Sequence, residues 1–486
     1  MSDSMVRTRV APSPTGEMHV GTLSIVLKNY AYAKGRRGKF ILRIEDTDQT
    51  REIAGAAEQI LSILDLFHLA PDEGPETGGP YAPYVQSKRL DIYHQYAQQL
   101  VEQKQAYYCF CSKERLEGLR DKQRADHVPP KYDRLCRNLS PEEIKTKLQT
   151  KQPYVIRLKV PDHQKIKFND LIRGDIEFGS DQVDDQVLIK SDGFPTYHLA
   201  VVIDDHLMQI SHVLRGEEWI SSTPKHVLLY QAFNWSLPIY AHIPIYLNPD
   251  GKGKMSKRKG TVSVSSFTSQ GYLPEALLNF LMILGWATKD EREILTLDEY
   301  IKEFDPKDIS QKSVVFDLKK LQWLNGVYIR NQTQEDLISR LKPFIPEDFP
   351  APLLQKVLPL IKERLILLSD FSHLTAFFYK PIEIASKELL KKSSAAQVKE
   401  QLNQLIAVLS QLSAQTWLTS HLESIVRKLQ ATQNWSKGQF FMMIRVAVTG
   451  QTQTPPLFET MEQIGHDLTL SRLNDALLSI SSDHTQ

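Results

Sequence analysis

The first 107 residues alternate between two spacings of apolar side chains. Residues 6–11 and 39–44 are rich in β-branched and apolar types, as in short buried strands. After Gly21, and again over 54–69 and 87–103, apolar residues recur every three or four positions, which is the spacing of amphipathic helices. This alternation of strands and helices predicts half of a doubly wound α/β sheet of the Rossmann type.

A segment of different character interrupts that sheet. Residues 113–137 carry eight Lys or Arg against five Asp or Glu, and short strands are expected at 154–160 and 186–190. The change in pattern predicts an α+β lobe inserted over residues 108–194.

The sheet pattern returns at about residue 195. Apolar runs at 199–203, 212–214 and 238–247 predict further strands. A helix is expected from Thr223, because a proline follows in its first turn, where proline is tolerated. The second half of the sheet domain is therefore expected over residues 195–260.

Strands are no longer predicted after about residue 270. Residues 276–284 are apolar on most sides, which indicates a packed helix, and two helical stripes follow that we interpret as core packing. The first stripe consists of Leu354, Val357, Leu358, Ile361, Leu365 and Leu368, and the second of Val398, Leu402, Leu405, Leu409 and Leu412. We expect a helical region over 261–330 and an all-α region over 331–486.

The composition excludes some classes of protein. Of 486 residues, 41% are hydrophobic and 24% charged, and the formal net charge is +1, so a polyanionic partner has to be met by local patches. No apolar run reaches the roughly 18 residues of a membrane span, and the N-terminus lacks the apolar core of a secretion signal. Three cysteines in one region argue against a disulfide framework and favour a reducing compartment, so we expect a cytoplasmic protein.

Candidate chemistry begins at the turn between the first strand and the first helix. His19 and Gly21 stand at the start of that helix, where backbone N–H groups can bind a phosphate. An imidazole can donate to a phosphate oxygen, and a glycine lets a base or a sugar approach the backbone. The pair by itself is not specific, because most histidines near turns are only solvated.

A second candidate is the basic segment at 252–260, which reads KGKMSKRKG. Such a run is usually a solvated loop. However, residues 254–258 resemble the KMSKR signature of class I aminoacyl-tRNA synthetases, and residues 19–22 resemble their His-Ile-Gly-His signature. The two lie about 230 residues apart in the order of that class. Together they indicate a nucleotide-activating enzyme.

Longer motifs narrow the resemblance to the bacterial glutamyl branch of that class. These motifs are APSPTGxxHxG from residue 11, RIEDTD at 43–48, DEGP at 72–75, YVQSKR at 84–89, KSDGFPTYHLAVVIDDHLM at 190–208, LRGEEW at 214–219 and AVTG at 447–450. The resemblance implies a Rossmann-type catalytic domain, an inserted lobe that holds the tRNA acceptor end, and an all-α anticodon-binding region. The glutaminyl relatives instead end in β-barrels.

The activity implied by this resemblance is that of a glutamate–tRNA ligase. Such an enzyme activates L-glutamate with ATP to glutamyl-adenylate and transfers it to the 3′ end of tRNA-Glu, usually as a monomer. Neither step needs a protein nucleophile, so catalysis depends on positioning and on cations where phosphate charge builds up. The residues expected to act are His19, Gly21, Lys254 and Lys257, and the ATP site adds Glu218, Ser256 and Arg258, with Mg²⁺ accompanying ATP. Thr22 replaces the second histidine of the class, as is common in the glutamyl branch.

The same resemblance implies a pocket for glutamate, which has two carboxylates and one ammonium group. The residues implied are Arg9 and Arg215 for the carboxylates, Ser13 and Tyr197 as hydrogen-bonding groups, and Glu45 for the ammonium. Guanidinium groups suit this task because they bind carboxylates through two parallel hydrogen bonds. In the alternative interpretation, the two arginines pair with Asp46, Asp48 or Asp204 and only order the loops.

Three rival functions remain open. A shortened relative that loads glutamate onto a modified anticodon base would lack the long helical region. A non-catalytic tRNA-binding or regulatory relative would be expected to lose His19 or Lys257, and both are present. A relaxed enzyme would also charge tRNA-Gln. The family uses an arginine near Arg364 to reject tRNA-Gln, and we expect Arg364 on a helix between Ile361 and Leu365.

The cysteines predict a possible structural zinc site. Cys109, Cys111 and Cys136 flank the charged segment, and zinc takes four ligands in a tetrahedron. Some members of the glutamyl branch supply a histidine two residues after the third cysteine, where this chain has Asn138. Tyr132 is the candidate for the fourth ligand and His127 a weaker one. The alternative is a relic site of three reduced thiols.

Overall fold

The computed structural model describes residues 5–14, 16–48, 50, 53, 55–255, 262–391 and 393–482. It divides the chain into two compact units. The first comprises Met1–Thr268 with Pro274–Leu318, and the second Ser269–Leu273 with Lys319–Gln486.

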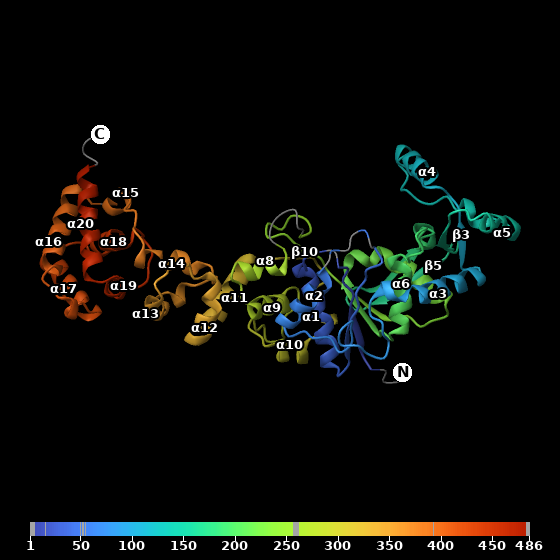
Figure 1. Ribbon diagram of the computed structural model, residues 1–486, viewed down its shortest axis with the longest axis horizontal. Coiled ribbons are helices and arrows are strands. Elements are labelled where there is room, and N and C mark those ends of the chain that lie inside the picture. The colour runs from blue at the N-terminus through green and yellow to red at the C-terminus, as the bar shows by residue number, and fades with distance from the viewer. Residues whose placement is uncertain are drawn as a thin grey trace. The chain divides into compact units, whose positions relative to one another are not determined.

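The first unit is built on a parallel sheet, drawn in blue and green in Figure 1. Strand β1 (Arg7–Val10) pairs in parallel with β2 (Lys39–Leu42), and β8 (His212–Gly216) pairs in parallel with β9 (Ile239–Ile243). The backbone N–H of Ser211 donates to the carbonyl of Arg7 at 3.0 Å, which places β1 beside β8. The doubly wound sheet predicted from the sequence is thus confirmed.

Helices cover this sheet. They are α1 (Val20–Gly35), α2 (Ala56–Leu66), α3 (Leu90–Glu102), α6 (Tyr197–Leu207) and α7 (Thr223–Ala232). The helix predicted to begin at Thr223 begins there, whereas the strand predicted at 199–203 is wrong, because this run lies in the middle of α6. All five of its residues are buried, so the run lacks the polar face that would have marked a helix.

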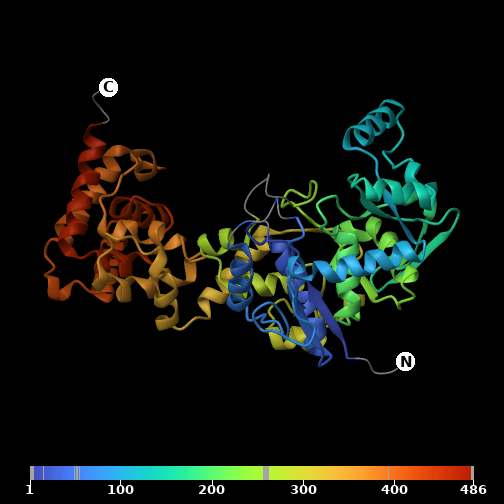
Figure 2. The ribbon, with the colours of Figure 1, turned by 45° about the vertical axis from the view of Figure 1, so that its right-hand side comes forward.

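The inserted segment contains a sheet of its own and a hairpin that joins the main sheet. Strands β3 (Ala106–Cys109), β4 (Val155–Leu158) and β7 (Val187–Ile189) are antiparallel, and α4 (Lys113–Ala125) and α5 (Pro141–Gln149) lie between β3 and β4 in sequence. These elements are drawn in cyan to green in Figure 2. The hairpin of β5 (Lys165–Asp170) and β6 (Gly174–Gly179) extends the main sheet, since Asp170 pairs with Tyr240 of β9. The strand order is β6-β5-β9-β8.

The end of the first unit contains two very short strands among helices. Strand β10 (Tyr246–Leu247) pairs in parallel with β11 (Val314–Val315), and the helices are α8 (Val264–Ser269), α9 (Pro274–Ile283) and α10 (Leu297–Glu303). The expectation that strands cease at residue 270 is therefore wrong at β11. It missed β11 because two residues are too few to show a period of two.

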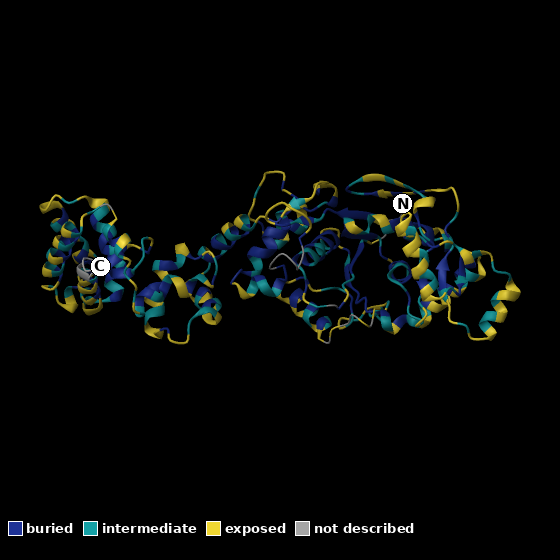
Figure 3. Cartoon of the chain, turned by 90° about the horizontal axis from the view of Figure 1, so that it is seen from above, coloured by how far each residue is buried: buried dark blue, intermediate teal, exposed yellow. Residues whose placement is uncertain are grey.

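In the second unit, every regular element among the described residues is helical. The α-helices are α11 (Leu318–Arg330), α12 (Gln334–Leu341), α13 (Ala351–Ile361), α14 (Asp370–Tyr379), α15 (Ser386–Leu390), α16 (Ala395–Leu409), α17 (Thr419–Thr432), α18 (Lys437–Thr449), α19 (Leu457–Ile464) and α20 (His466–Ser482). Figure 3 shows that these helices carry both buried and exposed positions, as the apolar stripes predict.

The first apolar stripe does not form one continuous helix. Helix α13 ends at Ile361 and a 3₁₀ turn over Lys362–Arg364 follows. Leu365 and Leu368 are buried as expected, but they and Arg364 lie beyond α13, so the expected helical position of Arg364 is wrong. Leu412 of the second stripe likewise lies beyond the end of α16. Within the described part of the chain, no helix is long and apolar enough to cross a membrane.

Candidate active site

The residues that follow the basic segment lie against the N-terminus of α1. The backbone N–H of Val20 donates to the carbonyl of Val262 at 2.9 Å, and that of Val264 donates to the carbonyl of Met18 at 2.9 Å. His19 and Ser263 form the β-bridge between these bonds. The chain that leaves the basic segment is therefore fixed directly against the helix that carries His19.

His19 is the N-cap of α1 and is held by its own backbone. Its Nδ1 accepts the N–H of Gly21 at 2.9 Å. An accepting Nδ1 carries no proton, so the neutral ring carries its proton on Nε2. A Cβ at Gly21 would lie 3.0 Å from His19 Nδ1, so the glycine allows this close approach.

Lys254 lies on the other side of the same cavity. Its backbone forms an isolated β-bridge with Leu247 of β10, and its Nζ lies 3.5 Å from Oε1 of Glu218. A cavity of about 350 Å³ is lined by His19, Gly21, Glu218 and Lys254 together with apolar residues such as Ile245. The structure thus brings together four of the residues expected to bind ATP. Ser256, Lys257 and Arg258 lie outside the described residues.

A larger cavity of about 640 Å³ adjoins the first, since both are lined by Thr22, Ile25, Gly216 and Glu218. All five residues expected to bind glutamate line this second cavity, namely Arg9, Ser13, Glu45, Tyr197 and Arg215. They come from β1, the turn after it, the segment after β2, the start of α6 and β8. A sheet of parallel strands presents such groups together at the carboxyl ends of its strands.

Arg9 is neutralised by a buried carboxylate. Its Nε lies 3.0 Å from Oδ1 of Asp205, and Nη1 of Arg43 lies 2.8 Å from the same oxygen. Burial opposes ionisation of Asp205, but the two guanidinium groups outweigh it and lower its pKa. Arg9 therefore has an acidic partner, although not one of those considered from the sequence.

Asp46, Asp48 and Asp204, the acids that the alternative interpretation paired with Arg9 and Arg215, have other partners. Asp46 accepts from Ser87, Asp48 accepts from Thr50, and Asp204 pairs with Arg89.

Glu45 is a carboxyl group of unusual pKa. Nη2 of Arg43 lies 3.0 Å from its Oε1. Burial nevertheless raises the pKa of Glu45 to about 7, against the opposing effect of the Arg43 and Arg9 guanidinium groups. Near neutral pH the carboxyl is therefore partly protonated when no substrate is bound.

Arg215 is held by neutral groups. Its Nη2 donates to Oγ1 of Thr223 at 2.8 Å, and its Nη1 donates to the hydroxyl of Tyr197 and to Nδ1 of His226, both at 3.3 Å. Burial, and then the charge of Arg215, lower the pKa of His226 well below its usual value. Among the described residues, no carboxylate lies within ion-pairing distance of Arg215. This guanidinium therefore presents a buried positive charge to the cavity.

Several residues of this site were not singled out from the sequence. They are Arg43, Asp205, Thr223, His226, His242 and Asp170. Asp205 gave a signal, because an acidic pair inside the apolar run before Met208 predicts buried ion pairs. The sequence held no signal for His226 and His242, since an isolated histidine in a strand or helix is usually structural.

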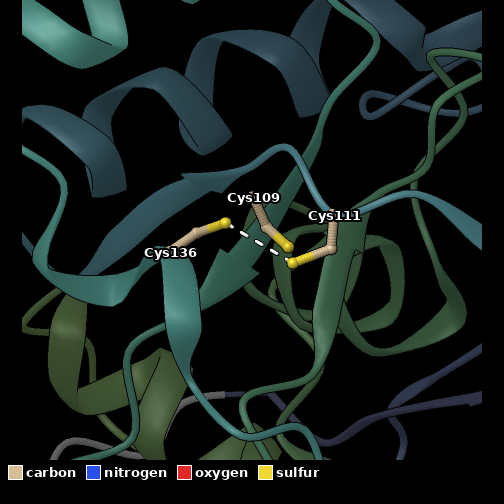
Figure 4. Close-up of side chains that lie close together, drawn as sticks. All are labelled: Cys109, Cys111 and Cys136. Carbon is tan, nitrogen blue, oxygen red and sulfur yellow. Dashed lines mark hydrogen bonds between the residues drawn. The ribbon is translucent and has the colours of Figure 1, made fainter. Parts of the chain in front are cut away.

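The three cysteines lie together in the inserted segment, with their side chains pointing toward one another (Figure 4). Their sulfur atoms all lie within 4.8 Å of one another, and Sγ of Cys111 is 3.6 Å from Sγ of Cys136. The hydroxyl of Tyr132 lies 3.3 Å from Sγ of Cys109 and 3.4 Å from Sγ of Cys111. His127 is exposed after α4 and is not part of this cluster.

Two arginines of the second unit lie close enough for their charges to interact. Arg364 is exposed, and Arg445 is half-buried with Nη1 donating to the carbonyls of Thr454 and Pro455 at 3.2 and 3.0 Å. Burial, and then the charge of Arg364, lower the pKa of Arg445. The charges of these two guanidinium groups therefore act on each other within this unit.

The chain matches two family models. Residues 5–323 match the catalytic domain of class I tRNA synthetases (E and Q), and residues 336–477 match an anticodon-binding domain. Among curated proteins, it is 43% identical to a glutamate–tRNA ligase of Finegoldia magna, over 98% of this chain and 99% of that protein. It is 44% identical to one of Dehalococcoides mccartyi, over 98% of each.

A solved structure of similar architecture comes from Elizabethkingia meningosepticum. It is a glutamate–tRNA ligase in complex with its amino acid, 36% identical to this chain with a TM-score of 0.87, and the match covers 98% of this chain and 100% of that one. A glutamate–tRNA synthetase of Elizabethkingia anophelis matches with a TM-score of 0.88.

Proposed function

Since the chain belongs to the class I tRNA synthetases of the E and Q type, we infer that it is the ligase that joins L-glutamate to tRNA-Glu with ATP. Its full-length relatives are glutamate–tRNA ligases, which supports glutamate rather than glutamine as the substrate. The observation in this chain that carries the inference is Arg215, a buried guanidinium among neutral partners that lines the larger cavity, next to the smaller cavity that His19 lines.

The geometry suits the first step of the reaction. We place glutamate in the larger cavity, with a carboxylate on Arg215 and the ammonium on Glu45, and ATP in the smaller one. The α-carboxylate of glutamate attacks the α-phosphate of ATP, and pyrophosphate leaves with the bonding electron pair. We assign His19 Nε2–H and the Lys254 ammonium as donors to phosphate oxygens, and we assign Lys257 to the same role because of the motif in which it stands. Mg²⁺ bound to ATP would neutralise further phosphate charge.

In the second step, a ribose hydroxyl of the tRNA terminus attacks the mixed anhydride, and AMP leaves. The protein again supplies positioning rather than a nucleophile. We assign the acceptor end to the inserted segment and the anticodon to the helical second unit. The match of residues 336–477 to an anticodon-binding model supports the latter assignment.

One experiment separates this function from its rivals. We expect glutamate-dependent exchange of pyrophosphate into ATP, stimulated by tRNA-Glu, followed by formation of glutamyl-tRNA. A non-catalytic relative would show no exchange. A shortened relative would show exchange without tRNA, and this chain retains the helical region that such relatives lack. Exchange supported by glutamine instead of glutamate would overturn the assignment.

The acidity of Glu45 predicts a pH dependence. If the ionised carboxylate holds the substrate ammonium, glutamate binding is strong above the Glu45 pKa of about 7 and weakens as pH falls through it. The ionised fraction falls from about 0.9 at pH 8 to about 0.1 at pH 6, so KM for glutamate should rise by about ninefold. Initial rates at saturating ATP would measure this change.

The control for this prediction is Glu45→Gln, which should have a high KM that no longer varies over that range. A wild-type KM that changes less than twofold between pH 6 and pH 8 would remove Glu45 from the ammonium site.

We propose that Arg364 helps to distinguish tRNA-Glu from tRNA-Gln. Its proximity to Arg445 supports contact with a nucleic acid, because two neighbouring cations favour a polyanionic partner. Arg364→Gln should shift the ratio of kcat/KM for the two tRNAs by roughly fivefold to a hundredfold if the arginine contacts a base. Arg427→Gln, on α17 and paired with Glu423, is the matched control. An unchanged ratio would exclude Arg364 from tRNA selection.

We propose that Cys109, Cys111, Cys136 and Tyr132 hold a structural zinc ion. Tetrahedral zinc with Zn–S bonds of about 2.3 Å separates its sulfur ligands by about 3.8 Å, and a phenolate oxygen lies about 3.5 Å from each sulfur. The distances of 3.6 Å between Cys111 and Cys136, and of 3.3 and 3.4 Å from the Tyr132 hydroxyl, fit this geometry. Zinc would tie the two ends of the charged segment together without entering the chemistry.

Protein purified without chelator should therefore contain about one zinc per chain. Removing the metal should lower the thermal stability while leaving the rate of adenylate formation nearly unchanged. Tyr132→Phe should retain less zinc than Tyr154→Phe, which serves as the control. Zinc content well below one per chain, not raised by growth in added zinc, would favour the relic site.

We expect the enzyme to act as a monomer in the cytoplasm, where tRNA is charged for translation.

A further inference from the structure

Behind Arg215 lies a chain of two buried polar groups that the two reaction steps do not use. Nε of Arg215 donates to Nε2 of His242 at 3.1 Å, and Nδ1 of His242 lies 2.6 Å from Oδ2 of Asp170. Arg215 and His242 are directly paired residues of β8 and β9, and Asp170 ends the neighbouring strand β5. The exposed fractions are 5% for Arg215, 0% for His242 and 1% for Asp170.

The protons in this chain can be placed from donor and acceptor chemistry together with the direction of the His242 pKa. A guanidinium has only donors, so Nε2 of His242 must be the unprotonated nitrogen that accepts from Arg215. Burial lowers the pKa of His242, so the ring is neutral and its single proton is on Nδ1, directed at Asp170. The order of donation is fixed from Arg215 through His242 to the Asp170 carboxylate.

Asp170 is itself immobilised by the backbone. Oδ1 accepts the N–H groups of Ile172 and Arg173, both at 3.0 Å, and Oδ2 accepts the backbone N–H of His242 at 3.0 Å. Burial opposes ionisation, but the bonds from His242 and from these backbone groups outweigh it and lower the pKa of Asp170. All of its bonds require a carboxylate that accepts.

We propose that Asp170 and His242 are positioning residues that hold Arg215 by its Nε and thereby set the preference of the pocket for a carboxylate over an amide. The proposal rests on the proposed function, because it assumes that Arg215 receives a substrate carboxylate. His242 holds Nε, Nη1 donates to Tyr197 and His226, and Nη2 donates to Thr223, so one N–H of Nη2 remains for the substrate. That group is a donor, so a glutamate carboxylate can accept from it, whereas the NH₂ group of a glutamine side chain would face a donor.

Asp170→Asn tests the proposal because the amide cannot reproduce these bonds. An NH₂ group in place of Oδ1 would meet two backbone N–H groups, and in place of Oδ2 it would meet the N–H of His242 and its Nδ1–H. Of these conflicts, only the one with Nδ1–H is relieved by moving the ring proton to Nε2, which then opposes Nε–H of Arg215. Breaking a charge-assisted hydrogen bond in this way should raise KM for glutamate about tenfold to a hundredfold.

The expected pattern is selective. KM for ATP should stay within about threefold of wild type, and inhibition by glutamine relative to glutamate should strengthen. His242→Gln, whose amide can accept from Arg215 and donate to Asp170, should retain most of the preference for glutamate. His212→Gln is the matched control, since His212 lies on β8 with its Nδ1 2.9 Å from the Ser211 hydroxyl and does not line the cavity.

A folded Asp170→Asn enzyme with KM for glutamate within threefold of wild type would overturn the proposal. Should that variant fail to fold, ¹⁵N NMR of histidine-labelled wild-type protein decides instead, with His242 assigned by its absence in His242→Gln. Observing the proton on Nδ1 supports the proposal, and observing it on Nε2 overturns it. If wild-type enzyme does not activate glutamate at all, the proposed function fails, and the NMR result still tests the hydrogen-bond order.

Discussion

Replacing Arg215 with glutamine should raise the free-energy barrier for the reaction of glutamate by about 2 to 5 kcal/mol. This corresponds to a roughly 30-fold to 5,000-fold loss of kcat/KM for glutamate. Arg215 is the one guanidinium of the proposed pocket whose charge no described carboxylate neutralises, whereas Arg9 is paired with Asp205 at 3.0 Å. Without it, a substrate carboxylate would be buried opposite Thr223, Tyr197 and His226, all of them neutral. Pyrophosphate exchange in the presence of tRNA would measure the loss.

Two further variants sharpen this result. Arg215→Lys keeps the charge but loses the planar fork, so its activity should lie between wild type and Arg215→Gln. Arg36→Gln removes a partly exposed arginine paired with Asp305, and it should leave kcat/KM unchanged. If Arg215→Gln charges glutamate as well as Arg36→Gln does, the carboxylate of the substrate is bound elsewhere.

Replacing Lys257 with alanine should raise the activation free energy of adenylate formation by about 3 to 4 kcal/mol. This is the usual effect of losing one hydrogen-bond donor to charge in the transition state. Lys257 lies outside the described residues, but the chain on either side of it is fixed. Met255 N–H donates to the carbonyl of Tyr246 at 2.8 Å, and Val262 accepts from Val20 at 2.9 Å. The motif assigns Lys257 to phosphate charge that develops in the transition state.

Single-turnover measurements with tRNA present would isolate this step from product release. KM for glutamate should change little, because Lys257 is assigned to ATP. Lys252→Ala, an exposed lysine of the same basic segment, is the control. A Lys257→Ala rate within about threefold of wild type, under 1 kcal/mol, would show that Lys257 has no such role.

The sequence predicted the sheet but not every element of it. Where helices have one buried and one exposed face, as in α2 and α3, the spacing of apolar residues was sufficient. It failed for residues 199–203, since a helix that is buried on all sides has the same apolar run as a central strand. The helix expected to continue through Arg364 ends at Ile361, yet Leu365 is buried, because a 3₁₀ turn keeps apolar residues at nearly helical spacing.

The site was predictable where residues fall in motifs and unpredictable where they act through packing. All five residues expected to bind glutamate line one cavity. Their buried partners Arg43 and Asp205 lie within quoted motifs, but nothing in a sequence shows which of two adjacent acids turns toward Arg9. His242 and Asp170 are 72 positions apart, and only the pairing of β5 with β9 brings them together.

The order of strands in the sheet also constrains how the protein is made. On the side away from β2, the neighbour of β1 is β8. Residues 212–216 of β8 are synthesised only after the whole inserted segment. At about 5 to 20 residues per second, the intervening roughly 200 residues take about 10 to 40 seconds to leave the ribosome. Throughout that interval β8 does not cover the edge of β1 opposite β2, and the backbone groups on that edge can pair with other chains. A nascent chain stalled before residue 212 would therefore expose an open strand edge, and it should depend on chaperones more than one stalled after β9.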